Sequence, residues 1–347
     1  MCDSIKVEYN KAIKGSAMHQ YAFVTIVFGA ELELLLLQAR SMSLYLNPTI
    51  VSEIVVINND SRPLGQSQIS KIKEEYGPLK SLVRFYQAKE ICNVPLTKGW
   101  RSQQVQKFAV ANYIKSDRYV VLDAKTHLIN NLDIRFLEDE SGRPTVNVYS
   151  YIDHPLYDVL NYVLKYLGVN PEEHALQFTA TVTPFIFDTN LVRDMMIDIE
   201  QKSGRSFPDE FVVQELTEFF LYSGWLLSKG IKLEDFFHFH QRFCQIVWGH
   251  LFSVDDCKFA IRVASDGAEP FFSVHRKAIA RFDLPQHVLI SKFWFDQKLF
   301  ASHNEALEFI TSFQKKLNKY QKFDRIRSLP AQMITVLRRM TVKKIQR

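Results

Sequence analysis

Residues 118–129 read RYVVLDAKTHLI, an apolar run of strand-forming residues that ends in a carboxylate and a lysine. The VVL triplet before Asp123 has no polar face, which is typical of a strand covered by helices on both sides. In open α/β sheets, ligands bind beyond the carboxyl ends of such strands. Residues two apart in an extended chain point to the same side, so we predict that Asp123 and Lys125 face one ligand site. The alternative is a strand-end aspartate that only turns the chain.

Alternating strands and helices are predicted around this stretch. Before it, residue patterns predict strands at 21–28, 51–58 and 81–88 and helices at 31–46, 67–76 and 100–115. Strand, helix and strand in succession favour right-handed βαβ units and a parallel sheet. After it, we predict helices at 155–167, from 190, at 209–230, 304–323 and 331–344, and strands at 179–188 and 270–274.

The composition is that of a globular protein. Of 347 residues, 47% are hydrophobic, which is enough for a sizeable core. No apolar run approaches the roughly 20 residues that cross a bilayer, and residues 1–15 lack the apolar centre of a secretory signal, so we expect a cytoplasmic protein. The four cysteines lie far apart without C-x-x-C spacing, so neither a disulfide framework nor a zinc knuckle is indicated. No G-x-G-x-x-G follows the first strand, which argues against a dinucleotide cofactor.

Basic residues are concentrated near the carboxyl terminus. Residues 291–347 hold 13 Lys/Arg against 4 Asp/Glu, which leaves 30 against 34 for residues 1–290. We therefore expect a main domain over 1–290 and a basic helical C-terminal extension over 291–347. Such a tail can associate with an anionic membrane surface, here the inner face of the membrane, or form a solvated helical face.

Two predicted helices carry polar residues that could reach the site at Asp123. In the helix 100–115, Gln104 and Lys107 lie off the apolar face, on a stripe that is either solvated or turned toward the end of the next strand. In the helix 209–230, Glu218 lies among aromatic residues. It is either a partly buried carboxylate suited to acid–base chemistry or part of an exposed face.

Histidines occur at two further predicted strands. His238 and His240 would lie on one side of an extended segment with metal-ligand spacing, but no third ligand is near in sequence, which favours a structural role. His275 and Arg276 follow the strand 270–274, and both can donate to anionic phosphate oxygens.

The order of these features resembles the glycosyltransferase fold called GT-A, and most closely an uncharacterised bacterial glycosyltransferase-like family acting in surface-polysaccharide synthesis. The resemblance covers roughly residues 20–285. It rests on five segments: VTIVFGAELELLLLQARSM, GWRSQQVQKFAVANYIKSDRYVVLDAKTHLI, TPFIFDTN, TEFFLYSGWL and FFSVHRKA. It implies a Rossmann-like α/β domain with a mostly parallel central sheet flanked by helices. The nucleotide half would span about 20–130 and the acceptor half about 131–290.

The resemblance also implies a chemistry. GT-A enzymes hold a divalent metal, Mn or Mg, against a nucleotide diphosphate with an Asp-x-Asp motif that closes the fourth strand. Asp123-Ala124-Lys125 occupies that place without the second aspartate. With Lys125 there, the local charge moves from about −2 to about 0, which disfavours a hard dication. The donor would be a nucleotide sugar and the acceptor a glycan or a lipid-linked glycan, with no nucleic acid partner.

By the same resemblance, individual residues receive expected roles. Asp123 and Lys125 would contact the donor diphosphate, and Glu218 and Asp123 would be the catalytic residues, with Glu218 on the acceptor side. Asp123 and His275 would be the metal ligands. The other donor-binding residues would be Gly29 and Asp60 at the nucleoside, Gln104 and Lys107 at the phosphates or sugar, and His275 and Arg276 at the phosphates.

Two alternatives remain open. A non-catalytic nucleotide-sugar-binding module of the same fold would account for the lost second aspartate. A nucleotidyltransferase shares the nucleotide half of the fold, but needs more carboxylates for magnesium than the sequence offers.

Overall fold

The computed structural model describes residues 19–97, 99–240, 244–267 and 269–320. The chain forms two compact units. Unit 1 holds the described residues up to Gln245 together with Ala264–Ser273, and unit 2 holds Ile246–Val263 and the described residues from Val274 onward. Residues 1–18, the predicted helix 331–344 and the end of the basic tail lie outside the described residues.

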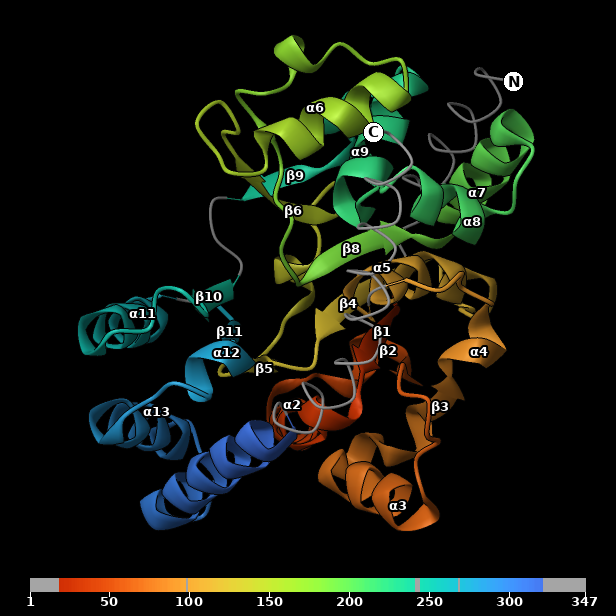
Figure 1. The fold of residues 1–347 in the computed structure, drawn as a ribbon. Helices are drawn as coiled ribbons and strands as arrows, with labels where there is room; N and C mark the ends of the chain where they lie inside the picture. The colour runs from red at the N-terminus through yellow and green to blue at the C-terminus, as the bar shows by residue number, and fades with distance from the viewer. Residues whose placement is uncertain (1–18, 98, 241–243, 268, 321–347) are drawn as a thin grey trace, which may run out of the picture. The chain divides into compact units, whose positions relative to one another are not determined.

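A five-stranded central sheet organises unit 1, with strand order β3-β2-β1-β4-β8 (Figure 1). The strands are β1 (Tyr21–Val27), β2 (Val51–Asn58), β3 (Val83–Gln87), β4 (Arg118–Asp123) and β8 (Phe185–Asp188). The first four run parallel, and β8 pairs antiparallel with β4. The predicted fold class, a mostly parallel central sheet flanked by helices, is confirmed.

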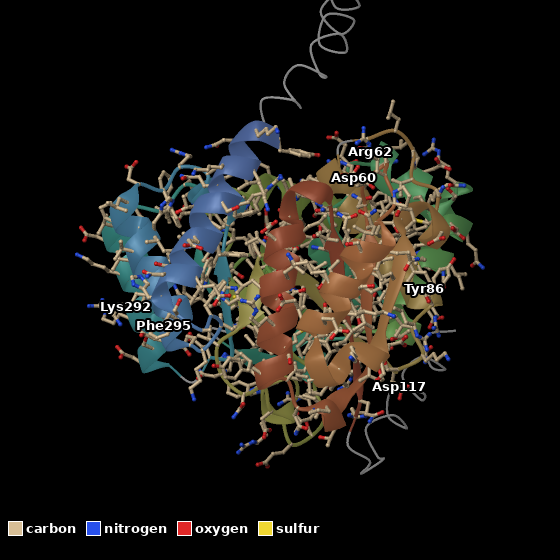
Figure 2. The ribbon with its side chains drawn as sticks, turned by 90° about the horizontal axis from the view of Figure 1, so that it is seen from below. Asp60, Arg62, Tyr86, Asp117, Lys292 and Phe295 are labelled. Carbon is tan, nitrogen blue, oxygen red and sulfur yellow. The ribbon has the colours of Figure 1, made fainter. Side chains whose placement is uncertain are left out.

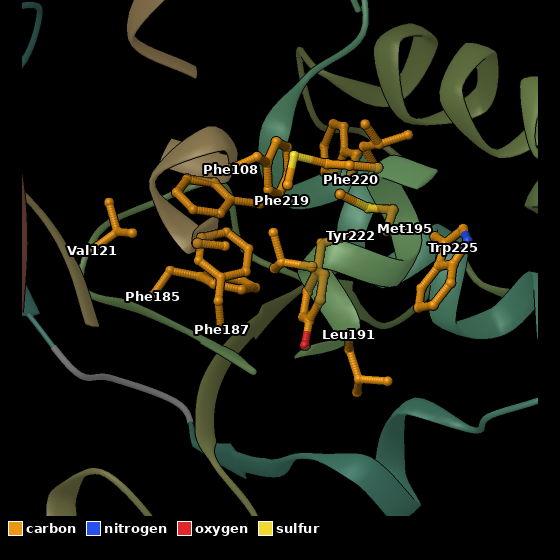
Figure 3. Close-up of a cluster of buried hydrophobic side chains, with 14 of the residues drawn as sticks. Phe108, Val121, Phe185, Phe187, Leu191, Met195, Phe219, Phe220, Tyr222 and Trp225 are labelled. Atoms are coloured by element: carbon orange, nitrogen blue, oxygen red, sulfur yellow. The ribbon is translucent and has the colours of Figure 1, made fainter. Parts of the chain in front are cut away.

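Helices cover both faces of the sheet. Successive strand residues point to opposite sides, and β1 and β4 are buried along nearly their whole length, so both faces are apolar and need cover. They are α2 (Leu32–Tyr45), α3 (Gln66–Glu75), α5 (Gly99–Ala109), α7 (Thr189–Ser203), α8 (Phe207–Val213) and α9 (Glu218–Ser228). On one face, Val24 and Val121 join an aromatic core that includes Phe108 of α5 and Phe219 of α9 (Figure 3). On the other face, Thr25 of β1 donates to a side chain of α2.

The predicted helix 209–230 is two helices, so that prediction is wrong. Glu215 adopts a left-handed φ of 51°, and the backbone N–H of Leu216 bonds the carbonyl of Phe211 at 3.1 Å, which ends α8. No glycine or proline marks this break, and the amphipathic pattern runs straight through it. As a result, Glu218 begins α9 and is not in the middle of a longer helix.

The stretch 118–129 is also divided. β4 ends at Asp123, Ala124 and Lys125 form a turn, and β5 (Thr126–Leu128) begins in a new direction. β5 pairs antiparallel with β11 (Phe271–Val274). The turn therefore lies directly at the carboxyl end of the central strand.

The remaining elements of unit 1 form a smaller sheet and short helices. The sheet has the order β7-β6-β9, with β7 (Phe178–Thr179), β6 (Thr145–Tyr149) and β9 (His238–His240). The predicted strand 179–188 is therefore split between β7 and β8. The helices are α4 (Ala88–Ile91), α6 (Tyr157–Tyr166) and α10 (Leu233–Phe236), with 3-10 turns at Gly29–Glu31, Pro48–Ile50, Gly77–Leu82, Val110–Asn112, Ile134–Phe136 and Pro171–Glu173.

Unit 2 is mainly helical. Its elements are most of α11 (Val254–Asp266), α12 (Arg276–Ile279), α13 (Leu284–Asp296) and a helical segment at 303–320, and β10 (Cys244–Val247) leads into it. Residue 290, the predicted end of the main domain, lies within α13. Among the described residues, none of the helices has the length and apolar character needed to cross a bilayer.

Candidate functional site

The carboxyl ends of the parallel strands bring together residues far apart in sequence. β1 lies between β2 and β4. The chain passes from β1 to β2 and β3 on one side of β1, and then returns to β4 on the other side of β1. Such a reversal of strand order is where open α/β sheets bind ligands. Figure 2 shows Asp60, which follows β2, far from Asp117, which precedes β4, so the two residues mark opposite ends of the strands.

Gly29 and Asp60, both predicted to lie at the nucleoside, are in contact at this edge, and the nucleoside role stays a prediction. The backbone N–H of Gly29 donates to Oδ2 of Asp60 at 3.2 Å. A Cβ at position 29 would lie only 2.9 Å from that oxygen, so the contact requires glycine. The other oxygen of Asp60 accepts from the Ser61 hydroxyl at 3.3 Å and from the backbone N–H of Arg62 at 3.4 Å. The carboxylate is held by the local backbone.

The amino end of α5 is fixed to the same edge. Asn59, just after β2, donates from Nδ2 to the Gly99 carbonyl at 3.3 Å and accepts at Oδ1 from the Ser102 hydroxyl at 3.0 Å. This holds α5 so that its third turn reaches the end of β4.

Four charged side chains form a continuous ion network at the end of β4. Lys107 Nζ of α5 lies 3.3 Å from Oδ1 of Asp123 and 3.1 Å from Oε1 of Glu218. Lys125 Nζ pairs with the other oxygen, Oδ2 of Asp123. The side chain of Asp123 is 34% exposed, against 8% for Lys107, 14% for Lys125 and 9% for Glu218. A ligand would therefore meet Asp123 first.

The network keeps its central members charged at neutral pH. Burial alone would raise the pKa of Asp123, but Lys107 and Lys125 outweigh it and hold that pKa well below its usual range. Burial alone would lower the pKa of Lys107, but Asp123 and Glu218 outweigh it and raise that pKa above its usual value. Two cations and two carboxylates give the site a net charge near zero.

A buried glutamine fixes the turn that carries Lys125. Gln38 of α2 donates from Nε2 to the carbonyls of Asp123 at 2.9 Å and Thr126 at 2.7 Å. Its Oε1 accepts from the Thr25 hydroxyl at 2.8 Å. Every polar atom of this amide is used, so the turn is tied to both β1 and α2.

Hydroxyl groups support the turn from the other side. Thr126 Oγ1 lies 2.7 Å from Ser273 Oγ of β11, which in turn lies 3.3 Å from Sγ of Cys244. Thr183 Oγ1 accepts from the backbone N–H of Asp123 at 3.4 Å. Burial raises the pKa of the Cys244 thiol to about 12, so this cysteine is a neutral hydrogen-bonding group.

Glu218 is buried, so of its two alternatives the exposed helix face is excluded. It is the first residue of α9, where the helix dipole favours negative charge. The Lys107 ammonium that binds it also lies 5.1 Å from the centre of the Phe219 ring. Through Lys107 it is joined to Asp123 at the end of β4, and its catalytic role stays a prediction.

Gln104 is also inside the protein and not on a solvated stripe. It lies one turn before Lys107 on α5, and its side chain is 1% exposed. Within the described part of the chain, neither Nε2 nor Oε1 of Gln104 has a hydrogen-bond partner. This amide is the least satisfied polar group near the network.

Asp123, one of the two predicted metal ligands, is already paired with two cations. Both oxygens of Asp123 face lysine ammonium groups, and a divalent cation would compete with two positive charges for the same carboxylate. His275 caps α12 in unit 2, where its Nδ1 accepts from the backbone N–H of Lys277 at 3.1 Å, and Arg276 is the first residue of that helix. The joint role of Asp123 and His275 stays a prediction, as does the phosphate role of Arg276.

The other histidine pair gives no third ligand. His238 and His240 lie on β9 as predicted, with ring centres 6.5 Å apart, and Nδ1 of His238 is 3.9 Å from Asp139. Over the ranges that the structure describes, no group of three or more His, Cys, Asp or Glu side chains is arranged to hold a metal ion.

Two residues at the site were missed from sequence: Gln38 and Thr183. Gln38 had a signal, because it is the one amide inside the apolar run LELLLLQA of the first helix. Thr183 had none, since a threonine beside an apolar strand is common.

The chain is similar to one protein family and to several solved structures. The model of a family described as "Family of unknown function (DUF6492)" matches residues 22–252. No curated protein matches the chain. Similar solved structures include the galactosyltransferase LgtC in complex with donor and acceptor sugar analogues, at 10% identity and a TM-score of 0.47, covering 81% of this chain and 96% of LgtC.

Two further solved structures are glycosyltransferases. The apo form of GlyE from Streptococcus pneumoniae TIGR4 has 11% identity and a TM-score of 0.42, and the match covers 85% of this chain but 64% of GlyE. The bifunctional WbbM has 10% identity and a TM-score of 0.41, with 75% of this chain and 46% of WbbM covered. At TM-scores below 0.5, these likenesses carry no argument about activity.

Proposed function

The chain belongs to the family of unknown function DUF6492, and from its own site we propose that it is a glycosyltransferase. It moves a sugar from a nucleotide-sugar donor to a glycan or lipid-linked acceptor, in surface-polysaccharide synthesis. The ion network at the end of β4 carries this proposal. It puts two lysines and two carboxylates where the sheet topology favours ligand binding.

The two lysines supply what a departing diphosphate needs. Charge that develops on the leaving group is stabilised by fixed cations, and such electrostatic stabilisation is commonly the largest catalytic term. A lysine ammonium has three N–H donors, so Lys125 can keep one on Asp123 and offer others to phosphate oxygens. Lys107 is fixed more firmly, because it bridges Asp123 and Glu218.

Asp123 and Glu218 then have separate tasks. Asp123 orients both lysines and is the exposed member of the network, so it also contacts the donor sugar. Lys107 binds Oε1 of Glu218, which leaves Oε2 to accept the proton of an acceptor hydroxyl as a general base. Gly29 and Asp60 form the nucleoside end of the site, where the Asp60 carboxylate accepts a hydrogen bond from a ribose hydroxyl.

A thermal-shift screen of the full-length protein tests the proposal. Nucleotide sugars and free nucleoside diphosphates are added with EDTA present, and a ligand at 100 times its dissociation constant should add about 2.7 kcal/mol of stability. Sugar transfer is then measured with the donor that binds. Failure of every nucleotide sugar and diphosphate to stabilise the protein, both with EDTA and with manganese in its place, would overturn the proposal.

A second candidate rests on one observation. Lys125 stands where the resembled family has a metal-binding aspartate, so the chain could be a nucleotide-sugar-binding module that performs no transfer. Binding of a donor with no release of nucleoside diphosphate, with or without manganese and a glycan acceptor, would favour the module.

A further inference from the structure

Two partly exposed aromatic rings lie side by side in unit 1, outside the ion network. Tyr149 is the last residue of β6, and His154 follows it in the next loop, with ring centres 6.3 Å apart and ring planes inclined by 27°. The buried ring of Tyr151 lies 6.5 Å from Tyr149 and, edge-on, 4.8 Å from His154. Its hydroxyl donates to the Thr179 carbonyl at 3.0 Å, which fixes this ring and so supports the other two. We call Tyr149 and His154 the aromatic platform.

Each ring of the aromatic platform also offers a polar atom. Nδ1 of His154 accepts from the backbone N–H of Leu156 at 3.1 Å, so Nε2 carries the proton of the neutral ring and can donate. Burial raises the pKa of Tyr149, so its hydroxyl stays neutral and can donate and accept. Among the described residues, neither Nε2 of His154 nor the Tyr149 hydroxyl is used in a hydrogen bond. The pair thus combines aromatic surface with free hydrogen-bonding groups, as ligand sites commonly do.

The aromatic platform is connected to the ion network through the start of β8. β6 contacts β8, the strand beside β4 (Figure 1). Tyr149 pairs with Phe178 between β6 and β7. Five residues further along the chain, Thr183 accepts from the backbone N–H of Asp123, and five extended residues span at most about 18 Å. The platform is therefore close to the end of β4 without being part of the network.

The platform lies on the Glu218 side of Asp123. Phe220, two residues after Glu218 on α9, packs edge-on against Tyr151 with ring centres 5.1 Å apart. The nucleoside end of the site follows β1 and β2, which lie on the opposite side of β4 from β8. A ligand that stacks on the platform is thus on the acceptor side of the network and not at the nucleoside end.

We propose that the aromatic platform holds one sugar residue of an oligosaccharide acceptor, at a distance from the hydroxyl that reacts. A pyranose ring has C–H groups on its faces that pack on aromatic rings, and hydroxyl groups on its rim that hydrogen-bond to their polar tips. An acceptor that reaches both Glu218 and the platform has more than one sugar residue, so oligosaccharides should bind better than monosaccharides. The inference rests on the proposed function and names its acceptor class.

Exposed apolar residues beside the platform make an isoprenoid chain the competing ligand. Ile152 and Leu176 follow residues 151 and 175, whose backbones are hydrogen-bonded to each other, and both side chains are exposed. An isoprenoid chain has no groups to pair with the polar atoms of Tyr149 and His154, so the platform suits the sugar better.

Ligand-detected NMR titrations of the full-length protein test the platform. The probes are glucose, galactose and N-acetylglucosamine, a linear tetrasaccharide of each, farnesyl phosphate, and UDP and GDP with and without manganese. We expect one or more tetrasaccharides to bind about 5-fold more tightly than the matching monosaccharide, equal to about 1 kcal/mol. Tyr149→Leu should remove that gain, and Tyr149→Phe should keep most of it because the ring remains. His154→Asn should also lower it, although the asparagine oxygen can still accept from the Leu156 N–H.

Tyr162→Leu is the matched control, because it removes an exposed tyrosine ring of α6 and should leave every affinity unchanged. Tetrasaccharides that bind no better than monosaccharides would overturn the platform, as would tetrasaccharide binding that Tyr149→Leu and His154→Asn leave unchanged. If Tyr149→Leu melts below the wild type, His154→Asn decides. Farnesyl phosphate binding that the variants weaken, without saccharide binding, would also overturn it.

The nucleotide probes separate this inference from the proposed function. Binding of UDP or GDP without binding of any tetrasaccharide would overturn the platform alone. Tetrasaccharide binding that depends on Tyr149, without binding of either nucleotide, would overturn the proposed function alone. A wild type that binds none of the probes would overturn both.

Discussion

Gly29 and Asp60, which follow two neighbouring strands, are in direct contact: the backbone N–H of Gly29 binds Oδ2 of Asp60 at 3.2 Å. Gly29→Ala would put a Cβ at 2.9 Å from this oxygen and push the carboxylate away. We expect nucleotide affinity to fall about 5-fold, the value of one hydrogen bond of about 1 kcal/mol. Gly65→Ala is the control, because its Cβ would meet the nearest atom at an ordinary 3.6 Å. Equal nucleotide affinity in the Gly29 variant and the wild type would remove Asp60 from the site.

Lys125 should neutralise the donor diphosphate in place of a metal. Lys125→Ala removes a charge-assisted contact worth about 1.5–3 kcal/mol, so donor binding should weaken roughly 10- to 100-fold, and chelation should leave the wild type active. Lys80→Ala, which removes an exposed lysine elsewhere in unit 1, is the control.

Metal dependence gives the contrary outcome for Lys125. Lys125→Asp should be about as impaired as Lys125→Ala unless manganese or magnesium is added. Restored activity with either metal would mean that the end of β4 still has metal-site geometry. A wild-type enzyme that EDTA silences and manganese revives would contradict the lysine mechanism. Asp123→Asn and His275→Ala should in that case lose metal binding together.

Glu218→Gln should separate binding from transfer. The amide oxygen can still accept from Lys107, so the fold and donor binding should survive, while loss of the base lowers transfer by roughly 10²-fold or more. Donor affinity and the transfer rate are measured on the same preparation. Unchanged transfer would move the role to another carboxylate; Asp209 and Glu210 on α8 come next, although Glu210 already binds Tyr166 and Arg205.

Folding stability should depend on pH through His127. Burial lowers the pKa of this histidine to about 3, below its ordinary value of 6.5. The unfolded chain therefore takes up a proton on His127 as pH falls below 6.5, and the folded chain does not. The contribution of His127 to the free energy of unfolding is fully present above pH 6.5 and is lost between pH 6.5 and about 3. The slope can reach about 1.4 kcal/mol per pH unit.

Urea unfolding of the wild type and His127→Gln at several pH values between 7 and 4 measures this slope. Glutamine keeps an N–H donor but does not titrate in this range, so the variant should show a shallower dependence. His287, whose pKa burial also lowers, is present in both proteins and cancels in the comparison. Parallel curves would mean that the pKa of His127 is the same in the folded and unfolded chains.

The basic tail should supply membrane association and not catalysis. Residues 325–347 lie outside the described residues, and the prediction rests on the charge of 291–347. Their removal should abolish binding to anionic vesicles, which depends on salt, and leave nucleotide binding intact. Sedimentation with vesicles at matched salt is the measurement, and equal binding by the shortened protein would make the tail a solvated helix.

Sequence patterns predicted the strands and helices where local signals were strong. The bounds of β2, 51–58, were predicted without error, since a β-branched run ends there in polar residues. Predictions failed where distant contacts decide the backbone. At the break near Glu215, Arg101 of α5 binds the Leu216 carbonyl, and the turn at Lys125 is held by Gln38, 87 positions earlier.

The site was predicted in the same uneven way. Asp123, Lys107 and Glu218 come from three different elements, yet each stood out as a charge at the end of, or within, an apolar pattern. Their joining into one network could not be predicted, because side-chain pairing between residues 111 positions apart follows from tertiary packing. Gln104 was predicted as a donor contact, but its burial without a partner is a property of the fold alone.

The Gln38 amide has a consequence for how this family can diverge. Because one side chain joins α2, β1 and the Lys125 turn, substitutions at 38 and at 125 cannot act independently, although they are distant in the chain. An aspartate placed at 125 would stand on a turn whose backbone Gln38 fixes, so its effect should differ between chains that keep this glutamine and chains that do not.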